Sequence, residues 1–212
     1  MNSQFTMKKK SDLHLLRKIW HFLGVVVIAI LYQIVPHSTA IQLMALAAAL
    51  FTTLDLLRKQ LPSLNNILIN VFAPIMRESE KNKIAGTTYL LNGVLLIMLF
   101  FPKPIVILCL LLLGTADPIA SFVGLKYGKD KILGNKTLQG SLAAFAISTI
   151  VAAVFFFTTN TMTERLMIVS LLSGLVGTFS ELIPVAKIDD NFTFPLLCAC
   201  GLWGIYYLFG GF

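Results

Sequence analysis

One acidic side chain in this sequence lies inside a long apolar run, where a charge is costly and usually functional. Asp117 is followed directly by Pro118, and a loop rich in glycine and lysine comes next. That loop ends at Lys136 and Thr137, where another apolar run begins. Lysine ammonium groups and the backbone N–H groups that glycines expose both bind oxyanions. The segment 117–141 therefore predicts a site for a metal ion and phosphate at a membrane surface.

Local backbone chemistry supports a cavity at this place. Pro118 has no N–H, so the carbonyl oxygen of Gly114 loses its helical partner inside the apolar run. Irregular backbone at that depth is tolerated where it lines a cavity. Lys136 and Thr137 begin the next predicted helix, and the free N–H groups of a helix N-terminus bind phosphate. The alternatives are a packing ion pair for Asp117 and an interfacial anchor for Lys136.

Three further acids lie near the ends of later apolar runs. Glu181 is inside the sixth run, and Asp189 and Asp190 directly precede the seventh. Carboxylate oxygens suit Mg²⁺, which usually keeps waters and substrate phosphates among its ligands. We predict that these three acids and Asp117 face one cavity and hold Mg²⁺ in some combination. The alternative for Asp189 and Asp190 is a solvated turn that caps the following helix.

Two charged groups lie outside the main segment. Arg17, Lys18 and His21 form R-K-x-x-H at the start of the first apolar run, with Lys18 and His21 about one helical turn apart. They are placed to contact phosphate or an acidic partner, or else to anchor the helix at the interface. Arg77 and Glu78 form a charged pair in a polar segment, where a solvated cluster is the alternative.

The composition places these residues in a polytopic membrane protein. Of 212 residues, 57% are hydrophobic and 13% are charged, and the mean hydropathy is +0.82. Such values exclude an ordinary soluble domain. The net charge of +7 is explained by lysines and arginines that set membrane topology, so no nucleic-acid partner is expected. The three cysteines lie in apolar runs without zinc-like spacing, which predicts buried thiols.

Seven continuous apolar runs predict an all-α polytopic membrane helix bundle, formed by a single domain over residues 1–212. Each run approaches the roughly 20 residues that cross a bilayer as helix. Their continuity argues against a β-barrel, whose strands alternate. No small-residue cleavage site ends the first run, so we expect a retained span and not a removed signal peptide. The predicted spans are 18–35, 40–57, 84–101, 104–125, 138–157, 166–183 and 192–209.

The segment 60–83 is too polar to cross the membrane. Its apolar residues recur at helical spacing, which predicts an amphipathic helix at the membrane interface. Asp55, just before this segment, is expected to pair with Arg58 or Lys59. The apolar residues concerned are Leu61, Leu64, Ile67, Leu68 and Val71.

The distribution of basic residues predicts the orientation of the chain. Of the 17 lysines and arginines, only Lys103 and Arg165 fall on one side of the predicted spans. By the positive-inside rule, the N-terminus is cytoplasmic and the C-terminus is outside. The acids named above then lie toward the cytoplasmic helix ends. We expect an active site facing the cytoplasm, in a bacterial or archaeal plasma membrane.

Small residues recur at four-residue intervals in three predicted spans. Such stripes allow helix backbones to approach closely in a membrane. We expect a lipid chain to lie between these faces, open to the bilayer. The stripes are Ala116, Ala120, Gly124 and Gly128, then Gly140, Ala144, Ser148 and Ala152, then Ser173, Gly177 and Glu181.

In chain order, these motifs resemble the membrane-bound CTP-dependent lipid kinases, which include dolichol kinase, phytol kinase and CTP-dependent diacylglycerol kinase. The resemblance covers nearly the whole chain. Its ordered set of motifs is more specific than any one of them. The matching pieces are R-K-x-x-H at 17–21, Arg77-Glu78 with Gly86, Asp117-Pro118-Ile119-Ala120 with Gly124 and Gly128, K-T-L-Q-G-S at 136–141, Glu181, and Asp189-Asp190-Asn191 with Pro195.

The resemblance implies transfer of the γ-phosphate of CTP to a lipid hydroxyl, and the choice of CTP comes wholly from it. The acceptor would be an isoprenoid alcohol of the polyprenol, dolichol or phytol type, or diacylglycerol. Asp117, Lys136 and Glu181 would be catalytic, with Arg77 and Glu78 as further site residues. The nucleotide would contact Arg17, Lys18, His21, Gly124, Lys126, Gly128, Lys136, Thr137, Gly140, Ser141 and Asn191.

Two other functions stay open at this point. The layout is also similar to phosphatidate cytidylyltransferase, although Leu133-Gly134-Asn135 stands where that family usually carries Ser-Pro-Lys before the Lys-Thr pair. A small transporter with acids inside the membrane is the second alternative. Gln139 departs from the kinases, which often carry glutamate there. This departure puts a metal-binding role at position 139 in doubt.

Overall fold

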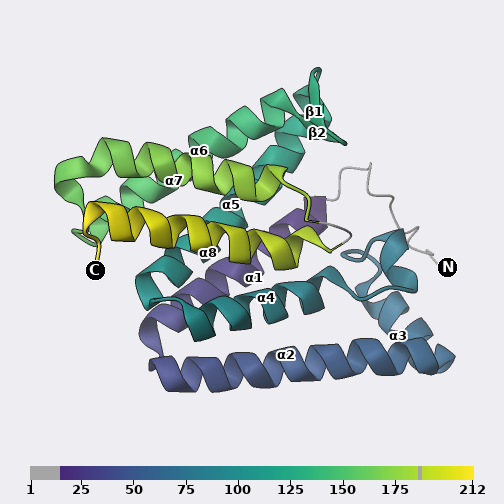
Figure 1. Ribbon diagram of the computed structural model, residues 1–212. Helices are drawn as coiled ribbons and strands as arrows, with labels where there is room; N and C mark the ends of the chain where they lie inside the picture. The colour runs from purple at the N-terminus through teal and green to yellow at the C-terminus, as the bar shows by residue number, and fades with distance from the viewer. Residues whose placement is uncertain (1–14, 186–187) are drawn as a thin grey trace.

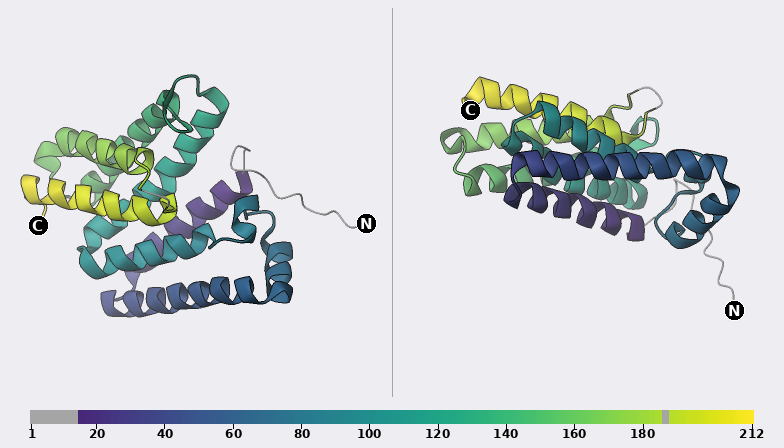
Figure 2. Two further views of the ribbon diagram at one scale, coloured as in Figure 1. Left: turned by 45° about the vertical axis from the view of Figure 1, so that its right-hand side comes forward. Right: turned by 90° about the horizontal axis from the view of Figure 1, so that it is seen from below.

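The computed structural model describes residues 15–185 and 188–212. Within them the chain forms an up-and-down bundle of long apolar helices, drawn in Figures 1 and 2. Lys8, Lys9, Lys10 and Lys187, which contribute to the predicted charge bias, lie outside the described residues. The bundle helices are α1 (Leu15–Ile34), α2 (His37–Gln60), α4 (Gly86–Phe100), α5 (Lys103–Tyr127), α6 (Leu138–Thr158), α7 (Leu166–Leu182) and α8 (Asp190–Phe209).

The bundle confirms a polytopic helical membrane fold, with one helix shorter than predicted. In the described part of the chain, six helices are long and apolar enough to cross a bilayer, counting a short 3₁₀ turn (η2, Thr163–Arg165) joined to α7. Helix α4 has 15 residues, or about 22 Å, which is less than the roughly 30 Å hydrocarbon core. Its start is held by α2, because Asp55 accepts hydrogen bonds from the backbone N–H of Ala85, at 2.9 Å, and from the Thr88 hydroxyl.

The segment 60–83 contains a short helix and a 3₁₀ turn. Helix α3 (Pro62–Phe72) begins with a proline, whose preset φ suits the first helical position. None of its residues is buried, and its apolar side chains Ile67 and Val71 are exposed. That exposure fits a helix lying at the membrane interface, which remains a prediction. The 3₁₀ turn η1 (Glu78–Lys81) leads back to α4.

A small hairpin, which the sequence did not predict, joins α5 to α6. Strands β1 (Lys131–Leu133) and β2 (Lys136–Thr137) pair antiparallel, and Gly134 in the turn has φ +58°. A two-residue turn with positive φ matches the twist of paired strands. The hairpin projects from the same end of the bundle as α3, opposite the C-terminus (Figure 1). It carries Lys136 to the start of α6.

The small-residue stripes pack α5, α6 and α7 against one another. A Cβ added at Gly140 would lie 2.7 Å from the carbonyl oxygen of Ala120, and one at Gly177 would lie 2.7 Å from the Ser148 hydroxyl. Ala144 and Ala152 are fully buried. These faces are therefore closed, and the expectation that a lipid chain lies between them is wrong.

The two ends of the bundle differ in charge, as expected from the sequence. Lys103 and Arg165 lie at one end, where the Lys103 ammonium donates to the carbonyl of Gln33 at 3.0 Å and Arg165 lies over the Phe209 ring. The start of α1 and the end of α5 lie at the other end, as do the starts of α4, α6 and α8. Which end faces the cytoplasm remains a prediction.

Candidate active site

At the end of the bundle that holds the starts of α1, α4, α6 and α8, called the charged end below, a partly buried ion pair joins α1 to η1. Arg17 donates through both terminal nitrogens to the two carboxylate oxygens of Glu80, each at 2.8 Å, and also to the carbonyl of Ile75. Glu80 accepts further hydrogen bonds from the backbone N–H of Arg77 and Gly86, at 2.9 and 3.1 Å. The carboxylate thus ties three chain segments together.

Charge and burial act in opposite directions on Glu80. Burial alone would raise the pKa of its carboxyl, but the hydrogen bonds and charge of Arg17, with the two backbone donors, lower the pKa below its ordinary value. Gly86 is required beside this pair, since a Cβ there would lie 2.6 Å from Arg17 Nη2 and 2.7 Å from Asn191 Nδ2. Asn191 therefore reaches the ion pair from the first turn of α8.

A second buried pair positions the loop that carries Glu80. Arg58 donates to Asp55 within α2, which confirms the predicted pairing. The same guanidinium donates to the backbone carbonyls of Glu80, at 3.0 Å, and Lys83. Asp55 in turn holds the start of α4. The Asp55–Arg58 pair therefore fixes η1 against the start of α4, and so positions Glu80.

The predicted halves of the site meet at Lys136. Its ammonium donates to the carboxylate of Glu181 and to the backbone carbonyl of Glu181 at 3.0 Å. It also lies 3.7 Å from Oδ2 of Asp190. Glu181 is buried, whereas the Asp190 side chain is 42% exposed. The hairpin, α7 and α8 thus converge on one cation.

The electrostatic surroundings hold Lys136 in its charged form. Burial would lower the pKa of this ammonium, but Glu181, Asp117 and Asp190 together raise the pKa above its ordinary value. The charge of Asp117, on α5, thus contributes to the electrostatic surroundings of Lys136. A persistent positive charge at this junction suits a bound phosphate group.

Asp117 itself lies near polar side chains of α1. Within residues 15–185 and 188–212, its carboxylate makes no hydrogen bond or ion pair, and it is half-buried. Its charge acts on Lys18 and His21 of α1, as does the charge of Arg77. Lys18 Nζ and His21 Nε2 are buried without a hydrogen-bond partner in the same part of the chain. Buried polar atoms are nearly always bonded in native proteins, so these groups indicate a ligand site.

The acids do not form a ready-made metal cage. In the described part of the chain, no group of three or more His, Cys, Asp or Glu residues is arranged to hold a metal ion. Asp189 caps α8 by accepting the backbone N–H of Asn191 at 3.0 Å, as its alternative interpretation predicted. Within the described residues, Asp117 makes no hydrogen bond or ion pair, and of the Asp190 carboxylate only Oδ2 is paired, with Lys136 at 3.7 Å. Two such groups with substrate phosphates fit the usual protein environment of Mg²⁺.

The predicted glycines of the nucleotide signature have packing contacts. Gly124, Gly128 and Gly140 surround Thr137, and a Cβ added at Gly128 would lie 2.6 Å from Thr137 Cγ2. The Thr137 hydroxyl caps α6 by accepting the N–H of Gly140 at 3.2 Å. Ser141 on the next turn is buried, and its hydroxyl has no partner among the described residues. A nucleotide contact for these residues remains a prediction.

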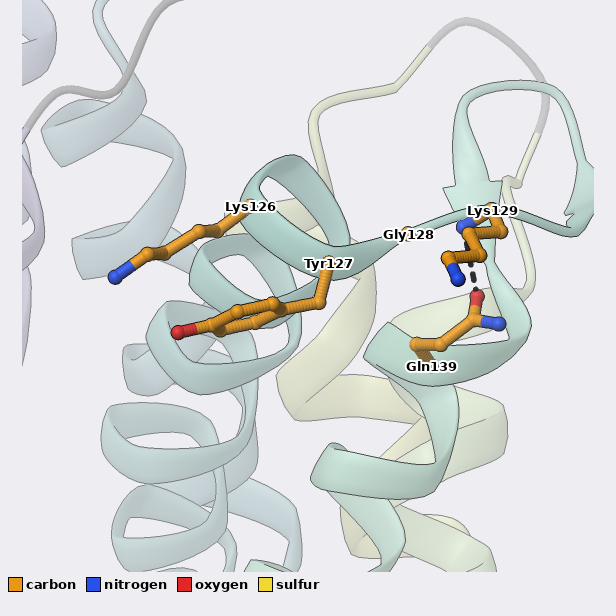
Figure 3. Close-up of a pocket in the computed structure, with 5 residues that line it drawn as sticks. All are labelled: Lys126, Tyr127, Gly128, Lys129 and Gln139. Carbon is orange, nitrogen blue, oxygen red and sulfur yellow. Dashed lines mark hydrogen bonds between the residues drawn. The ribbon is translucent and has the colours of Figure 1, made fainter.

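An open hollow of about 480 Å³ lies where α5 ends and α6 begins (Figure 3). Lys126 and Tyr127 line it from α5, and Gln139 from α6. Gln139 accepts the N–H of Lys129 at 3.0 Å and donates to Asp130 at 2.7 Å, so its amide holds the loop together. The Lys126 ammonium lies over the rings of Phe122 and Tyr127.

Sequence reasoning missed the acid that pairs with Arg17. The prediction placed Glu78 beside Arg77 in the site, but Glu78 is exposed. Glu80, two residues later, is the buried partner. An arginine at the start of an apolar helix was a signal that some acid must meet it. The choice between Glu78 and Glu80 depends on the 3₁₀ turn, which the sequence pattern did not reveal.

The chain is similar in sequence to enzymes named as lipid kinases. It is 35% identical over 159 residues to CTP-dependent diacylglycerol kinase 1 of Schizosaccharomyces pombe, covering 70% of this chain and 73% of that protein. The Saccharomyces cerevisiae protein of the same name is 29% identical over 85% of this chain and 69% of its own length. Dolichol kinase of Saccharomyces cerevisiae is 30% identical over 89% of this chain, but over 36% of its own length.

No protein-family model matches the chain, and no solved structure matches it. The similarity to the Schizosaccharomyces pombe enzyme extends over most of both proteins. A bundle of apolar helices, with buried polar groups at one end that have no hydrogen-bond partner in the described residues, agrees with that similarity. The chain therefore belongs to the family of membrane-bound CTP-dependent lipid kinases.

Proposed function

We propose that this membrane kinase transfers the γ-phosphate of CTP to the hydroxyl of diacylglycerol at the junction of Asp117, Lys136, Glu181 and Asp190. The observation that carries the proposal is the convergence of the hairpin, α7 and α8 on Lys136, beside an acid with no bonded partner among the described residues. Phosphoryl transfer requires positioning and charge neutralisation more than covalent chemistry by the protein. This junction supplies both kinds of group.

The cations would bind the transferring phosphate. Lys136 is held charged by Glu181 and reaches toward Asp190, so it is oriented at the start of α6. Lys18 has a buried ammonium that lies over the Phe122 ring and makes no hydrogen bond within the described residues. The charge of Arg77 also acts on this ammonium. Charge built up on phosphate oxygens during transfer would be neutralised by these groups.

Asp117 would act on the acceptor. Its carboxylate accepts the proton of the lipid hydroxyl while the hydroxyl oxygen attacks the γ-phosphorus of CTP. The bond from that phosphorus to the bridging oxygen breaks, and CDP leaves. The products are phosphatidate, CDP and a protonated Asp117, which then releases its proton to solvent. Glu181 is a positioning residue, since it acts by holding Lys136.

Asp190 would hold Mg²⁺ together with the nucleotide phosphates, since its carboxylate offers the hard oxygen ligands that this ion prefers. Asp117 would then stay free of the ion and able to accept the proton. The bound ion would neutralise charge on the β- and γ-phosphates. Asp189 is not given this role, because its carboxylate caps α8.

Diacylglycerol is proposed as the acceptor because the Schizosaccharomyces pombe relative, matched over most of its length, is a diacylglycerol kinase by name. The test uses purified protein in detergent micelles, CTP labelled on the γ-phosphate, and either diacylglycerol or a polyprenol. We expect label in phosphatidate. CTP labelled on the α-phosphate is the control and should leave the lipid unlabelled. Transfer of α-label, or label in the polyprenol alone, would refute the proposal.

A further inference from the structure

An apolar groove of about 240 Å³ runs between α1 and α5, beside the candidate site. Ile19 and Phe22 on its α1 side are 45% and 39% exposed, so the groove opens at the outer surface of the bundle. In a membrane helix bundle that surface faces lipid. Helix α1 contributes Lys18, Ile19 and Phe22, and α5 contributes Gly114, Pro118 and Ile119.

The lining of the groove suits hydrocarbon. Thr115, which also lines it, donates its hydroxyl to the carbonyl of Leu111 in its own helix, at 2.7 Å, and keeps no free polar hydrogen. Gly114 adds no side chain. The volume is below the roughly 300–1,000 Å³ of pockets that enclose a whole drug-sized ligand. A segment of an acyl chain fits such a space, whereas a nucleotide does not.

Polar groups gather at one place along the groove. Lys18 lines it, and the Lys18 ammonium is buried over the Phe122 ring, without a hydrogen-bond partner in residues 15–185 and 188–212. His21 Nε2 is likewise buried without a hydrogen-bond partner in the described residues. Asp117 directly precedes Pro118 of the lining, and its charge acts on both side chains. The groove is thus apolar along its walls and charged where it meets the site.

We infer that this groove binds the acceptor lipid. An acyl chain lies against Ile19, Phe22 and Ile119, and the hydroxyl end lies beside Lys18 and Asp117. The inference rests on the proposed function and adds the place where the acceptor enters. The closed faces between α5, α6 and α7 offer no such space. After transfer, the new phosphate is next to the Lys18 ammonium, which is a suitable partner for it.

Kinetics of two matched variants test the inference. Ile19→Trp fills the groove, whereas Leu16→Trp, at a 59% exposed position of α1 outside the groove, does not. We expect Ile19→Trp to lower kcat/KM for long-chain diacylglycerol at least tenfold, through KM, with KM for CTP unchanged within twofold. Leu16→Trp should match the wild type. Equal acceptor kinetics in both variants and the wild type would overturn the inference.

Photo-crosslinking tests the groove without relying on activity. A diacylglycerol with a diazirine near its headgroup is added to the full-length protein in phosphatidylcholine vesicles. We expect labelling of segments 15–22 and 114–119 that excess unlabelled diacylglycerol abolishes. The inference would be overturned if excess unlabelled diacylglycerol did not reduce the labelling of these two segments, or reduced labelling only at other segments. Competed labelling without any phosphate transfer would refute the proposed function and leave the groove assignment standing.

Discussion

Lys136 depends on partners from two other helices, so its loss affects both stability and activity. Removing it leaves Glu181 as a buried, uncompensated acid, which costs about 3 kcal/mol. We predict that Lys136→Ala lowers the unfolding temperature by several degrees, and that Lys136→Ala with Glu181→Gln recovers most of the loss. Neither protein should transfer phosphate. Thermal unfolding and labelled-CTP assays in the same detergent check both statements, and an active double variant would contradict the role of Lys136.

Glu80 should control stability in acid. Its folded-state pKa lies below the ordinary 4.5, so its stabilising contribution is present above pH 4.5 and is lost as pH falls through the lower folded value. We predict that Glu80→Gln is less stable than wild type at pH 7 and that the difference shrinks below pH 4.5. Denaturant unfolding across this range measures it. Glu78→Gln, at an exposed position, is the control and should follow the wild type at each pH.

At the scale of elements, glycines allow the helices to pack closely, because atoms of neighbouring helices fill the space where a side chain would lie. Gly140→Ala would place a Cβ 2.7 Å from the carbonyl of Ala120, whereas Gly204→Ala on α8 meets nothing within 4 Å. We predict that Gly140→Ala destabilises the protein by about 1–3 kcal/mol. Gly204→Ala should be neutral or stabilising by up to about 1 kcal/mol. Unfolding of the two variants side by side decides this, and equal effects would contradict the packing of α5 on α6.

The elements also show what the sequence could predict. Apolar runs predicted the bundle helices, because a helix in lipid must be apolar over about 20 residues. The sequence also predicted that Lys136 lies near Glu181 and Asp190, because the predicted topology puts all three at helix ends on the same side of the membrane. The late start of α4 was not predictable, because Asp55 of α2 sets it from 30 residues away. The pairing of Arg17 with Glu80 likewise depends on a 3₁₀ turn 63 residues distant.

At the scale of the whole molecule, the charged end should face the cytoplasm. The basic residues of the hairpin lie at the site end, and Arg165 lies at the other end. We predict that a membrane-impermeant maleimide applied to intact cells labels Arg165→Cys and spares Lys129→Cys. Inside-out vesicles should give the reverse, with the wild type as the background for the native cysteines. The opposite pattern would contradict the orientation.

The central claim is that Asp117 serves chemistry and not packing. Because its carboxylate makes no hydrogen bond in the described residues, Asp117→Asn loses only charge–charge attraction to Lys136 and Lys18. We predict that its unfolding temperature falls by no more than about 4 °C. Glu164→Gln, at the opposite end of the bundle, is the matched control for loss of one carboxylate.

The most direct measurement is the rate at which purified Asp117→Asn transfers label from γ-labelled CTP to diacylglycerol. A general base typically contributes about 10²–10⁴ in rate. We therefore predict a loss of at least a hundredfold in kcat, with normal membrane insertion and with Glu164→Gln fully active. A folded Asp117→Asn protein with near wild-type transfer would contradict the account.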